Sequence, residues 1–136
     1  MERHASPEGE VRFFELVVPS LTNHYGTLYG ANALHLMGKA AFVCAARYAR
    51  CPVVMAKADS IEFHKPFRLG EIADIRARVV FRGRSSMTVL VEVEAEDPDA
   101  GVSDMALSGR FMMVAVNADG VPTPIPNQAK PEEVTT

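Results

Sequence analysis

A polar loop that leads into an apolar segment contains the residues best suited to chemistry. The loop reads Asn-His-Tyr-Gly-Thr-Leu-Tyr-Gly over residues 23–30, and the apolar segment starts at Ala31. If that segment is a helix, the backbone amides of Gly30 and Ala31 have no partner inside it and lie at the positive end of its dipole. We therefore expect these amides to face a bound ligand. Asn23 adds a side-chain amide, which either binds a ligand or caps a turn.

The other residues that could do chemistry are ionisable side chains. If residues 53–65 form a strand without a bulge, Asp59 shares one face with apolar neighbours, namely Val53, Met55, Ile61 and Phe63. Desolvation on such a face raises the pKa of a carboxyl group toward a value useful for proton transfer. The alternative for Asp59 is an ion pair with Lys57 or with an arginine at a subunit interface. His24 and His64 could serve as acid or base. Neither has a visible partner, and we expect them to be structural or surface groups.

The segment after the loop predicts a buried helix. Residues 31–46 are apolar on almost every side of a helix, whereas a surface helix has a single apolar stripe. We therefore expect other elements to enclose it. His35 and Lys39 lie four residues apart on one helix face, which should reach a pocket or a subunit interface. Pro52 prevents continuation, so the helix should end near residues 47–50.

Five segments show the alternation typical of β-strands. They cover residues 11–18, 53–65, 75–81, 87–95 and 105–116. In the third segment the inward residues should be Ile75, Ala77, Val79 and Phe81. Arg82-Gly83 has the size of a tight hairpin connection, so the third and fourth segments should pair antiparallel. Together these elements predict an α+β fold in which a curved antiparallel sheet of about five strands wraps a long central helix.

Length and composition fit a single cytoplasmic domain. The chain has 136 residues and a formal net charge of −3, which gives no reason to expect nucleic acid as a partner. We expect its two cysteines, Cys44 and Cys51, to be reduced thiols, and we expect no metal site. The apolar run is too short for a membrane span, so no membrane partner is expected. The domain should cover residues 11–126, between a flexible N-terminal arm (1–10) and a flexible C-terminal tail (127–136).

A single sheet that covers a helix has a second face. The apolar residues on that other face include Leu90, Met112 and Val114. Exposed apolar side chains on a sheet indicate self-association. We therefore expect at least a dimer.

Four motifs, taken in order, resemble the hotdog-fold acyl-CoA thioesterases, and within them the acyl-CoA hydrolase branch. The motifs are Asn23–Gly30, Met37–Ala41, Ala58–Pro66 and Gly83–Val89. The resemblance runs from about Val11 to about Pro126. It implies a hotdog fold, dimers with a sheet that continues across the interface, trimers of such dimers that make a homohexamer, and active sites shared between protomers.

The resemblance also implies roles for individual residues. Asn23 matches an asparagine that, in the family, lies opposite the helix acid and comes from the partner chain, and here its amide would orient a water molecule. Gly38 stands where the helix of the family carries an aspartate that acts as general base or nucleophile. The amides near Gly30 and Ala31 would hold the thioester carbonyl and stabilise the oxyanion formed from it.

With Gly38 in place of the acid, another residue must take the proton from water. Asp59 is the first choice for this role and Glu62 the second, provided that the side chain faces the pocket. Arg84, Ser85 and Ser86 match a family segment that contacts coenzyme A. Arginine suits phosphate groups through its rigid set of donors, and serine hydroxyls can hold the pantetheine arm.

Two hypotheses follow for the function. The first is an acyl-CoA thioesterase that produces a free acid and coenzyme A, with Asn23, Gly30 and Asp59 as catalytic residues and no cofactor. The alternative is a non-catalytic acyl-CoA-binding or regulatory hotdog protein that lost the helix aspartate. A hydroxyacyl dehydratase needs a histidine paired with a helix carboxylate, and residues 31–47 contain no carboxylate.

Overall fold

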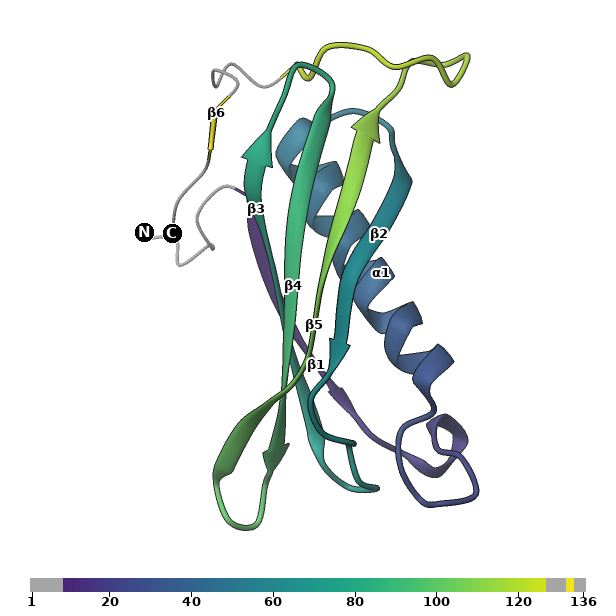
Figure 1. The fold of residues 1–136 in the computed structure, drawn as a ribbon, viewed down its shortest axis with the longest axis vertical. Helices are drawn as coiled ribbons and strands as arrows, with labels where there is room; N and C mark the ends of the chain where they lie inside the picture. The colour runs from purple at the N-terminus through teal and green to yellow at the C-terminus, as the bar shows by residue number, and fades with distance from the viewer. Residues whose placement is uncertain (1–8, 127–131, 134–136) are drawn as a thin grey trace, which may run out of the picture.

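In the residues that the computed structural model describes, 9–126 and 132–133, one long helix packs against an antiparallel sheet. The helix α1 covers Gly30–Ala49 (Figure 1). The strands are β1 (Glu10–Leu16), β2 (Val53–Phe63), β3 (Ile72–Arg82), β4 (Ser86–Asp97), β5 (Val102–Ala115) and the short β6 (Glu132–Glu133). The sheet order is β1-β3-β4-β5-β2, and β6 pairs with β3. The predicted α+β fold with about five antiparallel strands is confirmed.

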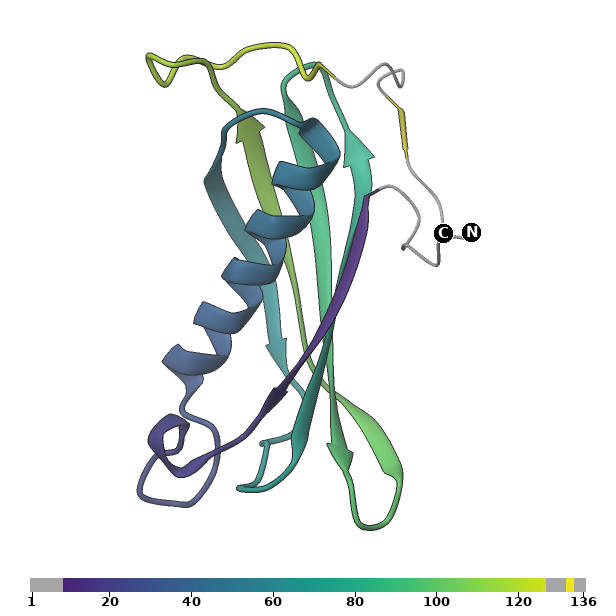
Figure 2. The same ribbon diagram turned by 180° about the vertical axis from the view of Figure 1, so that it is seen from behind.

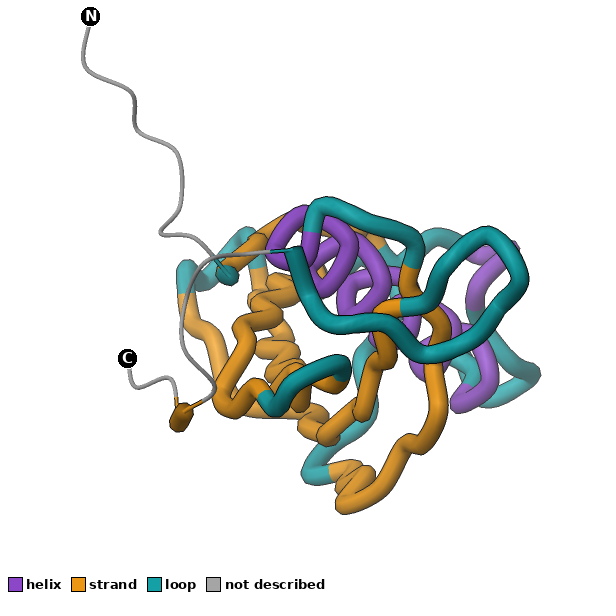
Figure 3. The backbone as a smooth tube through the Cα atoms, turned by 90° about the horizontal axis from the view of Figure 1, so that it is seen from above, coloured by secondary structure: helices purple, strands orange, loops and turns teal. Residues whose placement is uncertain are grey.

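One face of α1 packs against the sheet, which curves around it (Figures 2 and 3). The buried residues of α1 are Ala33, Leu36, Met37, Ala40, Ala41, Cys44, Ala45, Tyr48 and Ala49. Outside this face, Leu34 is 42% and Phe42 is 50% exposed, and His35 and Lys39 are exposed as well. Our expectation that the helix is enclosed on every side is therefore wrong for the single chain, because the sheet covers only one side. Among the described residues, no helix combines the length and apolar character needed to cross a membrane.

The alternation expected for the central strands is present, with one shift. In β4 every second residue is buried: Met87, Val89, Val91, Val93 and Ala95. In β3 the register with β4 shifts between Val79 and Phe81. Phe81 is consequently 48% exposed and Arg82 is buried, although we expected Phe81 to point inward. A bulge of this kind changes the face that each later side chain occupies.

The ends of the folded unit differ from the predicted boundaries. Glu10 already belongs to β1, and the backbone oxygen of Gly9 accepts a hydrogen bond from the thiol of Cys44 (3.3 Å). These two residues of the predicted N-terminal arm are therefore part of the domain. Residues 1–8 lie outside the described residues, and of the predicted C-terminal tail only β6 is described.

Both cysteines are free thiols, as expected. Cys44 is buried in α1, and this burial is the main cause that raises the pKa of its thiol to about 12. Burial also raises the pKa of the Cys51 thiol. Because the thiolate is the nucleophilic form of cysteine, neither residue is suited to nucleophilic catalysis.

The sheet face that points away from α1 contains a buried carboxylate. Asp74 of β3 is only 5% exposed, and it accepts hydrogen bonds from Arg12 Nε (3.0 Å), Arg12 Nη2 (2.9 Å) and Arg76 Nη2 (3.3 Å). Burial alone would raise the pKa of this carboxyl group. The two guanidinium groups outweigh burial, so the pKa of Asp74 lies below its usual value.

This lowered pKa makes part of the stability depend on pH. The ion pairs of Asp74 contribute stability above the pKa of an unfolded aspartate, about 3.9, and lose it as the pH falls through the folded value. We expect Asp74→Asn to lower the free energy of unfolding by about 1 kcal/mol at pH 7, since both arginines are about half exposed. Urea unfolding at pH 7 and pH 3 should show this difference shrinking in acid. The Asp74 ion pairs would not be stabilising if the loss in free energy of unfolding were the same at both pH values. The same conclusion would follow if the loss equalled that caused by Asp99→Asn, a change at an exposed aspartate.

Candidate functional site

The loop before α1 is fixed to its surroundings by backbone hydrogen bonds. After a short 3-10 turn (Pro19–Leu21), the amide of Tyr29 donates to the oxygen of Leu21 (3.0 Å) and the amide of Leu28 donates to Phe67 (2.9 Å). The side-chain amide of Asn32 also donates to Leu21 (3.0 Å). These bonds hold the start of α1 against the turn that follows β2.

The first turn of α1 has free backbone amides, and its first residue, Gly30, lines a pocket. The first hydrogen bond of the helix runs from the amide of Ala33 to the oxygen of Tyr29, and no side chain caps the helix start. The amides of Gly30, Ala31 and Asn32 therefore have no hydrogen-bond partner among the described residues. Beside them lies a pocket of about 330 Å³, lined by Leu28, Gly30, Phe63, His64, Lys65 and Pro66. Of the two residues that we expected to face a ligand, Gly30 and Ala31, Gly30 lines this pocket.

Asn23 organises the loop through one atom of its side chain. Its Oδ1 accepts hydrogen bonds from the amides of Tyr25 (2.9 Å) and Thr27 (3.3 Å) and from Oγ1 of Thr27 (3.2 Å). The interpretation of Asn23 as a turn residue is therefore supported. Its Nδ2 has no hydrogen-bond partner among the described residues, so this nitrogen is the atom left for a ligand.

The predicted coenzyme A segment lies at the other end of the molecule. Ser85 and Arg84 accept backbone hydrogen bonds from Ala115 (2.7 Å) and Ile125 (2.9 Å), and Val116 donates to Pro52, just beyond the end of α1. The connection between β3 and β4, which contains Arg84 and Ser85 and leads into Ser86, is thus beside the C-terminal end of α1 (Figure 1). A helix of 20 residues is about 30 Å long. A single chain therefore does not bring this hairpin to Gly30.

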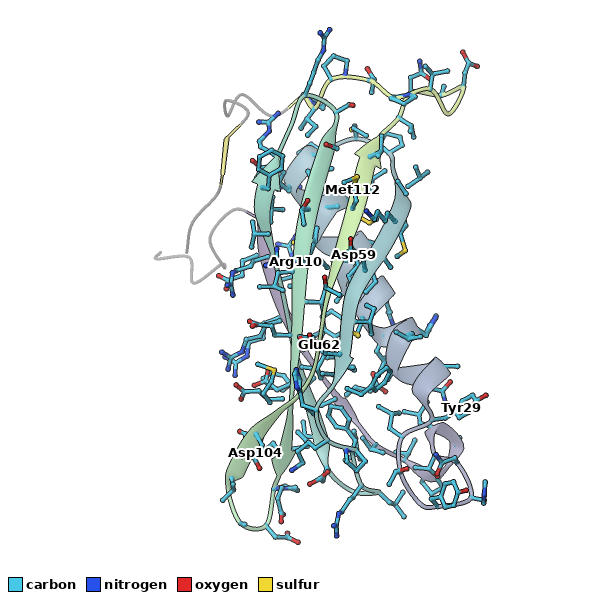
Figure 4. All side chains as sticks on the ribbon, in the orientation of Figure 1. Tyr29, Asp59, Glu62, Asp104, Arg110 and Met112 are labelled. Atoms are coloured by element: carbon cyan, nitrogen blue, oxygen red, sulfur yellow. The ribbon has the colours of Figure 1, made fainter. Side chains whose placement is uncertain are left out.

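Asp59 lies on the sheet face that points away from α1. The register of β2 with β5 shifts between Met55 and Lys57 and again between Asp59 and Glu62. Asp59 pairs with the exposed Arg110, whereas the flanking residues of β5 are buried. Figure 4 shows Asp59 and Arg110 on the face opposite the helix. The predicted apolar face for Asp59 is therefore wrong, because the bulges turn its side chain outward.

The surroundings of Asp59 are polar and open to solvent. Its carboxylate lies 3.4 Å from Nζ of Lys57, and 48% of its side chain is exposed. A separate hollow of about 270 Å³ is lined by Lys57, Asp59, Thr88, Arg110 and Met112. The ion pair with Lys57, which we considered as the alternative, is thus present, and the chain does not join Asp59 to the pocket at Gly30.

Gly38 leaves room for a side chain on α1. A Cβ atom built there would meet only the Cε atom of Met55, at 3.4 Å, which is ordinary contact. Met55 is 45% exposed, and Leu34 and Phe42 lie one turn before and after Gly38. The position where the family would carry an aspartate is therefore apolar and accessible in this chain.

One residue at the pocket has partners that the sequence did not reveal. Nε2 of His64 lies 3.3 Å from Oγ of Ser108 and 3.6 Å from Oε1 of Glu62. Ser108 is 44 residues away in the chain, so only the pairing of β2 with β5 brings it close.

Among the described residues there is no group of three or more side chains suited to a metal ion.

Comparisons with known proteins agree with this architecture. Residues 25–102 match the family model of the thioesterase superfamily. An uncharacterised acyl-CoA thioester hydrolase of Zymomonas mobilis is 35% identical over 121 residues, which cover 89% of this chain and 81% of that protein. An acyl-CoA hydrolase of Staphylococcus aureus, solved with butyryl coenzyme A and coenzyme A, is 31% identical with a TM-score of 0.83, covering 88% of this chain and 73% of that one. A hexameric acyl-CoA thioesterase is also 31% identical, with a TM-score of 0.85 and coverage of 88% and 76%.

Proposed function

Because the chain belongs to the thioesterase superfamily, we propose that it hydrolyses acyl-CoA to a free acid and coenzyme A. One observation supports this most: Gly30, whose amide has no partner among the described residues, lines a pocket at the positive end of the helix dipole. Donors placed in this way stabilise the negative charge that develops on a carbonyl oxygen. The solved relative that holds butyryl coenzyme A adds support for the substrate class.

The proposed reaction needs only these groups, water and a general base. The thioester carbonyl accepts hydrogen bonds from the amides of Gly30 and Ala31, and Nδ2 of Asn23 binds the attacking water or the oxyanion. The oxygen of water bonds to the carbonyl carbon, one proton passes to the base, and the π electrons move to the carbonyl oxygen. When the carbonyl forms again, the C–S bond breaks, and the thiolate of coenzyme A takes the proton back from the base.

We propose that the complete site is shared between protomers of a homo-oligomer. Arg84, Ser85 and Ser86 lie at the end of the molecule opposite Gly30, so a second protomer must supply them to the same ligand. The edge strand β2 has Val54, Met55 and Phe63 exposed, which favours its pairing with β2 of a second copy. Together with the hexameric relative, this supports a dimer or a trimer of dimers. The free thiols favour the cytoplasm.

The role of Arg84 in binding the phosphate groups of coenzyme A has a direct test. We expect Arg84→Ala to raise KM for an acyl-CoA about tenfold, because one charge-assisted hydrogen bond is lost, and to leave kcat unchanged. The matched control Arg47→Ala removes an exposed arginine at the same end of the molecule and should change neither value. With an acyl-pantetheine, which lacks the nucleotide, the two variants should behave alike. An equal rise in KM for both substrates would contradict the phosphate contact.

The proposed function is tested by the release of free thiol from acyl-CoAs of short, medium, long and aromatic chains. The proposal predicts turnover of at least one of them, with equal amounts of acid and coenzyme A. Saturable binding without turnover of any acyl-CoA would instead favour a non-catalytic acyl-CoA-binding protein. This is the second candidate, because Gly38 stands at the position of the helix aspartate.

Asp59 lies on the outer sheet face, so it could take part in catalysis only if another subunit placed its own Asp59 at the pocket. Asp59→Asn in the same assay tests that arrangement.

A further inference from the structure

The pocket at Gly30 needs a proton acceptor that α1 does not supply. The helix Gly30–Ala49 contains no aspartate or glutamate. Asp59 belongs to a different hollow on the far side of the sheet. Of the residues that line the pocket with Gly30, only His64 and Lys65 can titrate. The amine of Lys65 already has a carboxylate partner, because it forms an ion pair with Asp104 (3.3 Å).

His64 is held at the pocket by both its backbone and its ring. Its amide donates to the oxygen of Ala106 (2.7 Å), which fixes the chain at the end of β2. On the ring, Nε2 lies near Ser108 Oγ (3.3 Å) and Glu62 Oε1 (3.6 Å). Nδ1 has no hydrogen-bond partner among the described residues. With the Nε2 proton directed to Ser108 and Glu62, the lone pair of Nδ1 is available to accept a proton.

A strained bulge brings Glu62 to this histidine. Ser60 has a φ of 55°, which is unusual for a residue other than glycine, and it lies where the register of β2 shifts. Because of the shift, Glu62 pairs with Ser108, and the side chain of Glu62 lies on the sheet face away from α1 (Figure 4). Gly109 makes the bulge possible, since the side chain of Ile61 fills the place that a Cβ of Gly109 would take. The strain therefore supports one particular arrangement of Glu62, His64 and Ser108.

We propose that His64 is the general base of the hydrolysis and that Glu62 positions its ring, an inference that rests on the proposed function. Nδ1 of His64 takes one proton from water as the water oxygen bonds to the thioester carbon. The carboxylate of Glu62 stabilises the imidazolium ion that results. His64 then returns the proton to the leaving thiolate of coenzyme A, so that neither an oxidant nor a metal ion is required. The imidazole of His64 thus serves as the base in place of the helix aspartate that the resemblance implies at position 38.

The test compares kcat for thiol release in His64→Gln with that in the unaltered protein. We expect His64→Gln to lower kcat about 10²-fold while the affinity for coenzyme A, measured by calorimetry, stays the same. Asp99→Asn, a change at an exposed residue between β4 and β5, should leave kcat unchanged. In His64→Ala, imidazole added to the buffer should restore part of the lost rate, because it can occupy the vacated space and accept the proton. A merely structural histidine would give no such rescue.

Glu62 is tested as a positioning residue through its dependence on His64. Glu62→Gln should lower kcat by less than His64→Gln does, with KM unchanged, and it should have no further effect in the His64→Gln background. Full activity of His64→Gln, or a loss that imidazole does not rescue, would overturn the proposal while leaving the hydrolase function intact. An equal or larger loss in Asp59→Asn would assign the base to Asp59 and overturn it too. Absence of thiol release by the unaltered protein would overturn both proposals.

Discussion

Replacing Gly38 by aspartate is expected to raise kcat for thiol release about tenfold or more. A Cβ atom at this position touches only the flexible end of Met55, so the helix accepts a side chain without moving its backbone. The new carboxylate would stand where the resemblance to the acyl-CoA hydrolases implies a catalytic acid. In the unaltered background His64 already provides part of the proton transfer. In the His64→Gln background the gain should therefore be larger, approaching about 10²-fold.

Two matched variants distinguish the effect of the new carboxylate on kcat from the effect of removing a glycine. Gly38→Ala should stabilise α1 by up to about 1 kcal/mol, because alanine is the better helix former, without changing kcat. Gly38→Asn has the shape of aspartate but cannot accept a proton at neutral pH. A gain in Gly38→Asn equal to that in Gly38→Asp, or no gain in either background, would show that position 38 does not face the reacting thioester.

Asn23→Asp is expected to lower kcat about 10²-fold while the thermal midpoint of unfolding stays close to that of the unaltered protein. The structure makes this separation possible because Oδ1 of Asn23 holds the loop and Nδ2 is free. Aspartate keeps an oxygen for the amides of Tyr25 and Thr27. It loses the Nδ2 donor and places a negative charge near the developing oxyanion.

The control for the loop itself is Thr27→Val, which removes the hydroxyl that donates to Asn23 and keeps the shape of the side chain. This variant should loosen the loop and lower the thermal midpoint slightly, with a much smaller loss of kcat. Steady-state kinetics and thermal unfolding of both variants decide between the two roles. Full activity of Asn23→Asp would show that Asn23 only holds the turn and takes no part in catalysis.

The elements of the fold could be predicted from the sequence because their patterns are local. The helix and the buried residues of β4 follow from periodicity alone, and the pocket-bordering position of Gly30 follows from the start of the helix. The sheet faces of Asp59 and Phe81 could not be predicted in this way. Their bulges depend on how β2 and β3 pair with neighbouring strands, and the bulge at Ser60 carries no glycine to mark it.

The candidate site was only partly predictable for a related reason. The resemblance implied a site shared between protomers, but the sequence does not show which residues one chain brings together, and the hairpin with Arg84 lies at the opposite end of α1 from Gly30. Likewise, His64 looked isolated because Ser108 is far away in the chain. Contacts made across the sheet, or between subunits, are set by tertiary structure and leave no local pattern.

The central claim is that Asn23 and Gly30 of one protomer act on the same ligand as Arg84 of another. Co-expression of Asn23→Asp subunits with Arg84→Glu subunits tests it most directly, with thiol release measured at a substrate concentration below KM. Each variant alone should be nearly inactive. Random pairing should restore about a quarter of the activity, because half of the dimers are mixed and each mixed dimer has one intact site out of two. Activity no higher than the average of the two variants would show that each chain builds its site alone, and would contradict the shared site.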